Sequence, residues 1–146
     1  MTKRKALHVP LLFLVALLVA CSGEPDQAAR EREENLAADD VWHAAKLRGV
    51  AFRAVGQEPA WLLEITNGEE ILLVTDYGAN RHSMPYVEPI VYQEERRTEY
   101  VLDSHATVVE IRGIRCTDTM SGESFEVSVT LFLDGKELHG CGRALF

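Results

Sequence analysis

The sequence predicts a mainly β protein, a small antiparallel β-barrel or sandwich of seven or eight strands preceded by a short helix. Two observations carry this prediction. From position 50 onward, apolar and polar residues alternate with a period of two, as on strands that bury one face. Gly, Pro, Asn and Asp separate these alternating segments, as they do in turns. The 97 residues from 50 to 146 are enough for one domain of this class.

A short helix is expected over residues 36–49, ahead of the β-domain. Apolar residues recur at helical spacing from Ala38 to Ala45, and Gly49 is a suitable residue to end a helix. We expect Trp42, on the apolar side of this helix, to pack on the domain that follows.

Eight segments of the β-domain, residues 50–146, have the alternation and the flanking turn residues of strands. They are Val50–Val55, Trp61–Thr66, Glu70–Asp76, Glu88–Gln93, Arg97–Leu102, Ala106–Arg112, Ser124–Leu133 and Lys136–Gly142.

The last two strands are expected to form a hairpin around Asp134-Gly135, because Asp-Gly favours a two-residue type I′ turn. This register pairs Leu131 with Leu138 and Glu126 with Arg143. An apolar pair and a pair of opposite charges therefore coincide, as cross-strand stabilisation requires.

An earlier hairpin is expected around Asn67-Gly68. A two-residue loop would place apolar residues opposite glutamates, whereas a three-residue loop that includes Glu69 pairs Ile65 with Ile71. We therefore expect the longer loop, with Gly68 in the left-handed conformation.

The first twenty residues have the organisation of a signal peptide. Three basic residues, Lys3 to Lys5, precede the apolar run Val9–Ala20, which is too short to span a membrane as a helix. The run ends in Leu18-Val19-Ala20-Cys21, which resembles the lipobox of bacterial lipoproteins. We expect cleavage after residue 20 and thioether lipidation of Cys21, since only a thiol can accept the diacylglycerol.

A diacylglycerol with an added N-acyl group such as palmitate would hold the protein stably on a membrane. Ser22 follows the cysteine, whereas inner-membrane retention usually uses Asp at this place. This favours the periplasmic face of the outer membrane. Residues 21–35 are expected to be the lipidated cysteine and an acidic flexible tether, because they contain almost no large apolar side chain.

The chain is acidic, with a formal net charge of −8. Without the three basic residues of the signal peptide, 12 basic residues stand against 23 acidic ones, a net charge of −11. Phosphate would repel such a protein, so nucleic-acid binding is not expected. A cationic periplasmic protein, such as a cell-wall hydrolase, is the partner that this charge favours.

Once Cys21 is lipidated, Cys116 and Cys141 remain, and two cysteines in an exported protein indicate a disulfide. In the hairpin register described above, Cys141 shares a face with Ser128 and Thr130, which is the outward face if the valines of that strand point inward. A bulge at the neighbouring glycines is one way to change this. A thiol or metal site with a histidine, His82, His105 or His139, is the alternative, but no CxxC or HxxxH spacing supports it.

Three segments together resemble a group of uncharacterised bacterial lipoproteins. They are Phe52–Trp61, Cys116–Gly122 and Gly140–Gly142. This domain sometimes accompanies META-type domains or domains like the membrane-bound inhibitor of c-type lysozyme. The resemblance covers roughly residues 50–146 and implies a small β-domain in the cell envelope. It implies no mechanism.

Five residues are candidates for binding: Glu58, Trp61, Asp118, Met120 and Ser121. Each also has a structural interpretation. Glu58 precedes a proline and suits the turn between two strands, and Trp61 suits a plug inside a barrel. Asp118 and Ser121 suit turns that satisfy backbone N–H groups. A neighbouring disulfide would hold their loop rigid, with Met120 as an apolar contact.

No enzymatic activity, cofactor or metal is expected. A hydrolase could be imagined from Ser121, His105 and Asp118, but GxSxG, HExxH, P-loop and GxGxxG motifs are all absent. The sequence favours a non-catalytic binding module of the envelope. Two alternatives are a purely structural lipoprotein and a small barrel for an apolar ligand, with Phe52 and Tyr86 beside Trp61 at its mouth.

Overall fold

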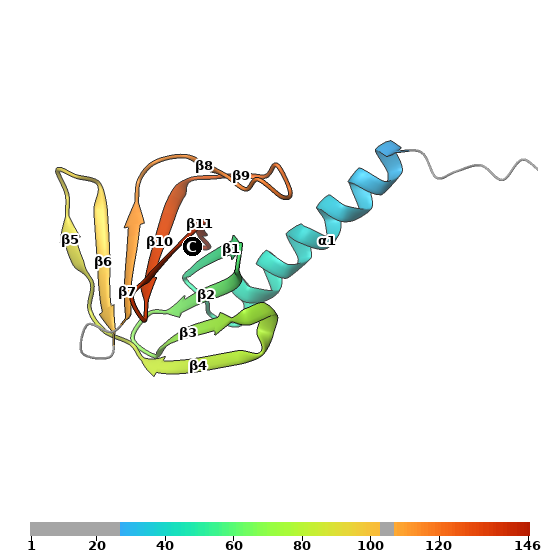
Figure 1. Cartoon of the computed structure of the whole chain (residues 1–146). Coiled ribbons are helices and arrows are strands. Elements are labelled where there is room, and N and C mark those ends of the chain that lie inside the picture. The colour runs from blue at the N-terminus through green and yellow to red at the C-terminus, as the bar shows by residue number, and fades with distance from the viewer. Residues whose placement is uncertain (1–26, 103–106) are drawn as a thin grey trace, which may run out of the picture.

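The computed structural model describes residues 27–102 and 107–146, and it confirms the mainly β class with one helix in front of the sheet (Figure 1). Helix α1 (Gln27–Leu47) is followed by a nine-stranded antiparallel sheet that curls into a half-barrel. The predicted signal peptide, residues 1–20, and Cys21 lie outside the described residues.

The sheet has the strand order β4-β3-β2-β1-β11-β10-β7-β6-β5, and a separate two-stranded ribbon pairs β8 with β9. The strands are β1 (Phe52–Gln57), β2 (Ala60–Thr66), β3 (Glu70–Thr75), β4 (Asn80–Pro85), β5 (Ile90–Tyr92), β6 (Arg97–Leu102), β7 (Thr107–Arg112), β8 (Cys116–Thr117), β9 (Ser124–Phe125), β10 (Val127–Leu133) and β11 (Lys136–Ala144). A short 3-10 helix, η1 (Asp76–Gly78), joins β3 to β4.

Three details of the strand prediction are wrong. The two-residue strand β8 was not among the expected segments. Strand β4 was not expected, because its sequence Asn-Arg-His-Ser-Met-Pro has no apolar alternation. It is an edge strand that is mostly exposed, so burial imposes no pattern on it. The strand expected over Ser124–Leu133 is divided at Glu126, where the chain leaves the β8–β9 ribbon and enters the main sheet.

Both hairpin loops are confirmed. Asp134 and Gly135 have φ values of 50° and 75°, as a type I′ turn requires, and the pairing that follows places Leu131 opposite Leu138. In the other hairpin Ile65 lies opposite Ile71, and Gly68 has a φ of 73°.

The expected pair of Glu126 with Arg143 is wrong. The ladder between β10 and β11 begins at Val127, which lies opposite Gly142. Arg143 forms its ion pair with Glu123 instead. Glu123 lies in the segment between β8 and β9, outside the hairpin, so no pattern in the hairpin sequence indicates this ion pair.

Helix α1 begins at Gln27, so residues 27–35, expected as part of a flexible tether, are helical. Ala, Glu, Arg and Gln dominate this stretch, and these residues have high helix propensity even where no apolar face is buried. The expected stop is confirmed. Gly49 has a φ of 89°, and the Val50 N–H donates to the Ala45 carbonyl across the helix end.

The concave face of the half-barrel holds the core. The buried residues of this cluster are Ala54, Trp61, Leu63, Ile65, Ile71, Leu73, Tyr100, Leu102, Val109, Val129, Leu131 and Leu138. Phe52 and Tyr86 pack against the same cluster. Phe52, Tyr86 and Trp61 therefore pack in or against the core.

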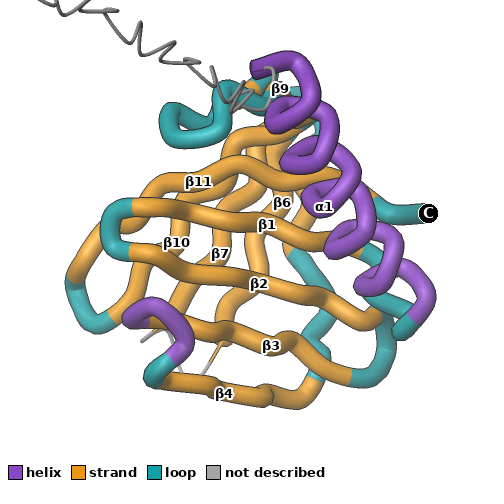
Figure 2. Tube along the Cα trace, turned by 90° about the vertical axis from the view of Figure 1, so that its right-hand side faces the viewer, coloured by secondary structure: helices purple, strands orange, loops and turns teal. Residues whose placement is uncertain are grey.

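The C-terminal half of α1 covers part of the convex face of the sheet, called the outer face here (Figure 2). The Trp42 ring lies 5.4 Å from the Phe125 ring and stacks under the guanidinium groups of Arg53 and Arg143, at 5.2 and 4.9 Å. These contacts confirm that Trp42 packs on the domain. Ala45 is fully buried in the same contact.

A buried ion cluster lies beside this contact. Glu64 is only 6% exposed and binds two guanidinium groups, that of Arg53 and that of Arg48, whose Nη2 lies 2.7 Å from Oε1. Burial lowers the pKa of Arg53, and the charge and hydrogen bond of Glu64 oppose that effect. Glu64 therefore compensates the cost of burying the positive charge of Arg53 on this face.

We predict that Glu64→Ala lowers the free energy of unfolding by about 3–5 kcal/mol, because it leaves the Arg53 guanidinium buried without its partner. Urea unfolding followed by tryptophan fluorescence measures the change. Glu69→Ala, at an exposed position in the adjacent loop, is the control and should change stability by less than about 0.5 kcal/mol. Equal effects of the two substitutions would refute the role of Glu64.

Candidate functional site

A surface segment is attached to the outer face by a disulfide. Residues 113–126, called the arm, connect β7 to β10 and contain the β8–β9 ribbon. Cys116 of the arm is bonded to Cys141 of β11, with 5.5 Å between the two Cα atoms. The disulfide predicted from the cysteine count is confirmed.

The expected outward direction of Cys141 is also confirmed. Cys141 lies opposite Ser128, whereas Val129 on the same strand is buried in the core. Cys141 is nevertheless only 4% exposed. The arm crosses over the outer face and brings Cys116 to it, so the bridge needs no bulge in β11.

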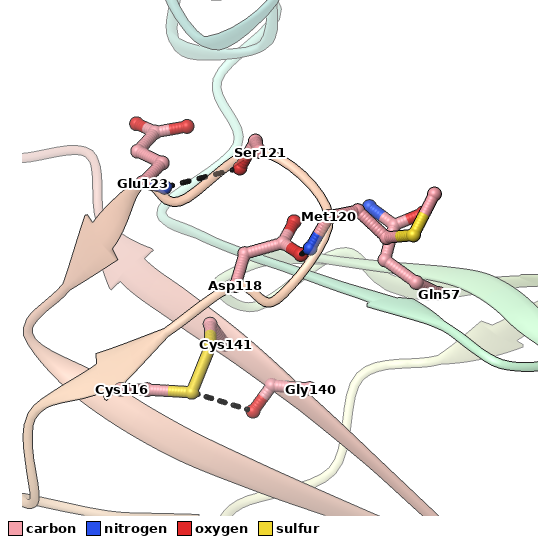
Figure 3. The surroundings of a disulfide bond; sticks show 8 residues. All are labelled: Gln57, Cys116, Asp118, Met120, Ser121, Glu123, Gly140 and Cys141. Carbon is pink, nitrogen blue, oxygen red and sulfur yellow. Dashed lines mark hydrogen bonds between the residues drawn. A yellow bond between two sulfur atoms is a disulfide. The ribbon is translucent and has the colours of Figure 1, made fainter.

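Asp118 organises the loop of the arm that joins β8 to β9 (Figure 3). Its Oδ1 accepts the Met120 backbone N–H at 2.8 Å, and its Oδ2 accepts Gln57 Nε2 of β1 at 3.0 Å. Ser121 Oγ accepts the Glu123 N–H at 3.2 Å. The turns expected at Asp118 and Ser121 are therefore present, and the Gln57 bond ties the loop to the sheet.

The environment of Asp118 has two opposing effects on its acidity. Burial raises the pKa of this carboxyl, and the hydrogen bonds from Met120, Gln57 and Ser121 together lower it further than burial raises it. The result is a pKa below the usual range, so Asp118 is ionised at neutral pH.

A cavity of about 400 Å³, called the disulfide groove, lies between the arm and the sheet. Its walls are residues 55–58, 116–119, 128–130, 137 and 139–141. Glu58, Asp118 and Glu137 contribute three carboxylates, and no Lys or Arg is among the described residues that line it. His139 Nε2 lies 3.6 Å from Glu137 Oε1 at the rim. The groove is therefore a preformed acidic site.

The structure brings together two of the five predicted binding residues, Glu58 and Asp118, at this groove. Ser121 and Met120 lie on the adjoining loop, where Met120 is 69% exposed. Trp61 does not line this groove: its side chain is buried in the core, and the residue lines a separate hollow beyond β1.

The glycines of β1 and β11 explain the position of Trp61. A Cβ on Gly56 would lie 2.1 Å from the indole Nε1, and one on Gly140 would lie 2.6 Å from Cζ2. The ring therefore lies directly against two strands that have no side chains at these points. This packing seals the core below the groove.

Sequence reasoning missed two residues of the site, Gln57 and Glu137, and considered His139 only as a histidine of the alternative thiol or metal site. The hairpin register contained a signal for the positions of Glu137 and His139. Glu137, His139 and Cys141 alternate on one face of β11, so a disulfide on that face places the other two beside it. Nothing in the sequence indicated Gln57, because its bond to Asp118 joins residues 61 positions apart.

A larger cavity of about 550 Å³ lies at the open end of the half-barrel. Its walls combine apolar side chains such as Leu73 and Leu138 with charges of both signs, including Asp134, Arg81 and Lys136. This mixture of charges does not indicate one class of ligand. The disulfide groove has acidic residues and no Lys or Arg in its described lining, so it does indicate a class of ligand.

Within the described ranges, no group of three or more His, Cys, Asp or Glu is placed to hold a metal ion. In that same part of the chain, no helix has the length and apolar character needed to cross a membrane. No protein-family model, curated protein or solved structure matches the chain. The resemblance to bacterial lipoproteins therefore stays a prediction.

We predict that Asp118→Asn lowers the free energy of unfolding at pH 7 by about 1 kcal/mol, because the charged acceptor of the hydrogen bonds from Met120 and Gln57 is lost. The pKa of Asp118 is lower in the folded state, so the carboxylate stabilises the fold above the unfolded-state pKa of about 4. This stabilisation disappears as the pH falls through the folded-state pKa. Urea unfolding at several pH values should therefore show the two proteins converging in acid.

Asp134→Asn is the control for this experiment, since Asn suits the same type I′ turn. Its stability relative to the original protein should not follow that pH dependence. A difference between Asp118→Asn and the original protein that stays constant down to pH 2 would contradict the role of the Asp118 charge.

Proposed function

We propose that this protein is a lipid-anchored, non-catalytic binding module at the periplasmic face of the outer membrane, and that its disulfide groove binds a basic protein. The observation that carries the proposal is the groove itself. Glu58, Asp118 and Glu137 line it, and none of its described lining residues is Lys or Arg. A cationic side chain is the ligand that such a site favours.

The walls of the groove are held in place before any partner arrives. The disulfide fixes the arm to β11, and the bond from Gln57 to Asp118 fixes the loop to β1. A site that is already ordered loses less conformational entropy on binding, which increases affinity. This rigidity supports a recognition role for the loop in addition to a structural one.

The charge of the whole chain supports a basic partner. At a net charge of −11 without the signal peptide, the protein would attract cationic proteins over long distances and increase their rate of association. Bacterial cell-wall hydrolases and lysozymes include strongly basic proteins of this kind. Inhibition or docking of such a hydrolase is the activity proposed.

Helix α1 supports the proposed anchoring at Cys21. Its 21 residues correspond to a length of about 30 Å, and Figure 1 shows that its N-terminal part extends away from the half-barrel. A helix of this length between a lipidated Cys21 and the domain would act as a spacer. It would hold the groove at a distance from the lipid headgroups.

The polar groups of the loop support a function without catalysis. The Ser121 hydroxyl and the Asp118 carboxylate both accept backbone N–H groups of their own loop. Both side chains are therefore engaged in holding the loop. His105, the third residue of the hydrolase site considered from the sequence, lies outside the described residues.

We predict that immobilised lipid-free protein carrying Cys21→Ser binds a c-type lysozyme, used as a basic hydrolase probe. The double substitution Glu58→Gln/Glu137→Gln should weaken binding about tenfold or more, because it removes two of the three groove carboxylates. Biolayer interferometry at low and high salt measures the affinity. Binding by the original protein should weaken as salt rises.

The matched control is Glu88→Gln/Glu94→Gln, which removes the same charge from two exposed positions outside the groove. It should weaken binding by less than about threefold. An equal loss in both double variants would mean that net charge alone attracts lysozyme. That result would overturn the assignment of the groove as the site.

For the anchor, we predict that Cys21→Ala abolishes lipidation and releases the protein into the soluble periplasmic fraction. Fractionation of cells followed by mass spectrometry of the mature N-terminus measures this. Globomycin, which blocks the lipoprotein signal peptidase, should cause the unsubstituted precursor to accumulate. A mature chain without acyl groups would contradict the proposed anchoring.

A further inference from the structure

The disulfide groove does not end at β1. A second hollow of about 230 Å³ lies across that strand, and it shares residues Val55, Gly56 and Gln57 with the disulfide groove. Its far side is formed by Leu62 and Val74, together with the segment at η1. The two hollows therefore adjoin along β1, and together they are called the two-part groove.

The second hollow differs chemically from the first. Val55, Leu62 and Val74 lie directly opposite one another on β1, β2 and β3, so they form one apolar row across the sheet. No charged residue is among the described residues that line this hollow. The depression thus has an acidic half beside the disulfide and an apolar half beside η1.

Tyr77 lies at the end of the apolar half and is 82% exposed. Its φ of 55° is in the left-handed region, as is that of Asp76, at 51°. Such values are uncommon for residues other than glycine and cost conformational energy. The backbone of η1, which Figure 2 shows beside the β1–β2 turn, thus holds an aromatic ring at the rim of the groove.

The dimensions of the two-part groove can be estimated from the sheet. The row from Ser128 through Cys141, Val55 and Leu62 to Val74 crosses five neighbouring strands. At about 4.8 Å between strands, it is roughly 19 Å long. An extended chain advances about 3.3 Å per residue, so about six residues would cover it.

We infer that the two-part groove binds an extended segment of the partner, with a Lys or Arg side chain in the acidic half and an apolar or aromatic side chain, two to four residues away, in the apolar half. This inference rests on the proposed function and specifies its partner. An anionic membrane surface or a nucleic acid would satisfy the apolar half poorly and would be repelled by Glu58, Asp118 and Glu137.

Fluorescence anisotropy with synthetic peptides tests the inference. The probe is fluorescein-labelled Gly-Ser-Lys-Ser-Gly-Phe-Gly-Ser, titrated with the full mature chain carrying Cys21→Ser. One comparison peptide has glutamine in place of the lysine, and a second has serine in place of the phenylalanine. Each replacement should weaken binding about tenfold, because each removes the side chain that one half of the groove accepts.

Two protein variants locate the halves. Glu58→Gln/Glu137→Gln should bind the probe and the glutamine-containing comparison peptide equally well, which is a loss of the lysine preference. Tyr77→Ser should bind the probe and the comparison peptide without phenylalanine equally well, which is a loss of the phenylalanine preference. Tyr77 is exposed, so its substitution does not disturb the core. Val91→Ser, at a residue that is 56% exposed on the opposite edge strand, is the control and should preserve both preferences.

The outcomes separate this inference from the proposed function. Suppose that lysozyme binding depends on Glu58 and Glu137. If no peptide binds, or if Tyr77→Ser keeps the phenylalanine preference, the inference is overturned and the proposed function stands. If neither lysozyme nor peptide binding depends on Glu58 and Glu137, both are overturned. Loss of each preference only in its own variant supports the two-part groove.

Discussion

A covalent bond on the outer face determines the surface that this protein presents. Cys141 lies on the side of β11 that faces away from the core, and the arm covers it where Cys116 is bonded to it. Two strands of two residues each and the buried ring of Phe125 would hold the arm weakly by themselves. Closing the 26-residue loop stabilises the fold by about 3–4 kcal/mol in the chain-entropy model. The second wall of the groove depends on this bond.

Several arginine side chains of the outer face form ion pairs with glutamates that lie away from the groove. Arg53 binds Glu64 under the helix, Arg143 binds Glu123 on the arm, and on β6 and β7 the guanidinium groups pair with glutamates of the same strands. Among the described residues, the lining carboxylates of the groove have no Lys or Arg partner. The groove therefore combines acidic lining residues with a cavity between the arm and the sheet.

Local patterns predicted elements well where burial on one side imposes alternation. Strand β6 runs over the expected residues 97–102, and both hairpin loops have the expected length. The same reasoning failed where burial imposes nothing, as at the exposed edge strand β4 and the start of α1. For the site, the glutamate at 58 and the aspartate at 118 were found from turn chemistry. Gln57 was not, because a side-chain amide 61 positions away leaves no trace in local sequence.

By itself, the sequence determined the mainly β class, the hairpin registers and the partnership of Cys116 with Cys141, because each follows from short-range periodicity, turn geometry or a count of thiols. Tertiary structure alone decided which distant segments meet. It placed the Trp61 ring against Gly56 and Gly140 and brought Cys116 of the arm to Cys141. It also joined an acidic hollow to an apolar one across β1. These arrangements depend on how the sheet curls and where the arm crosses it, and such contacts between distant residues are set by the packing of the whole chain.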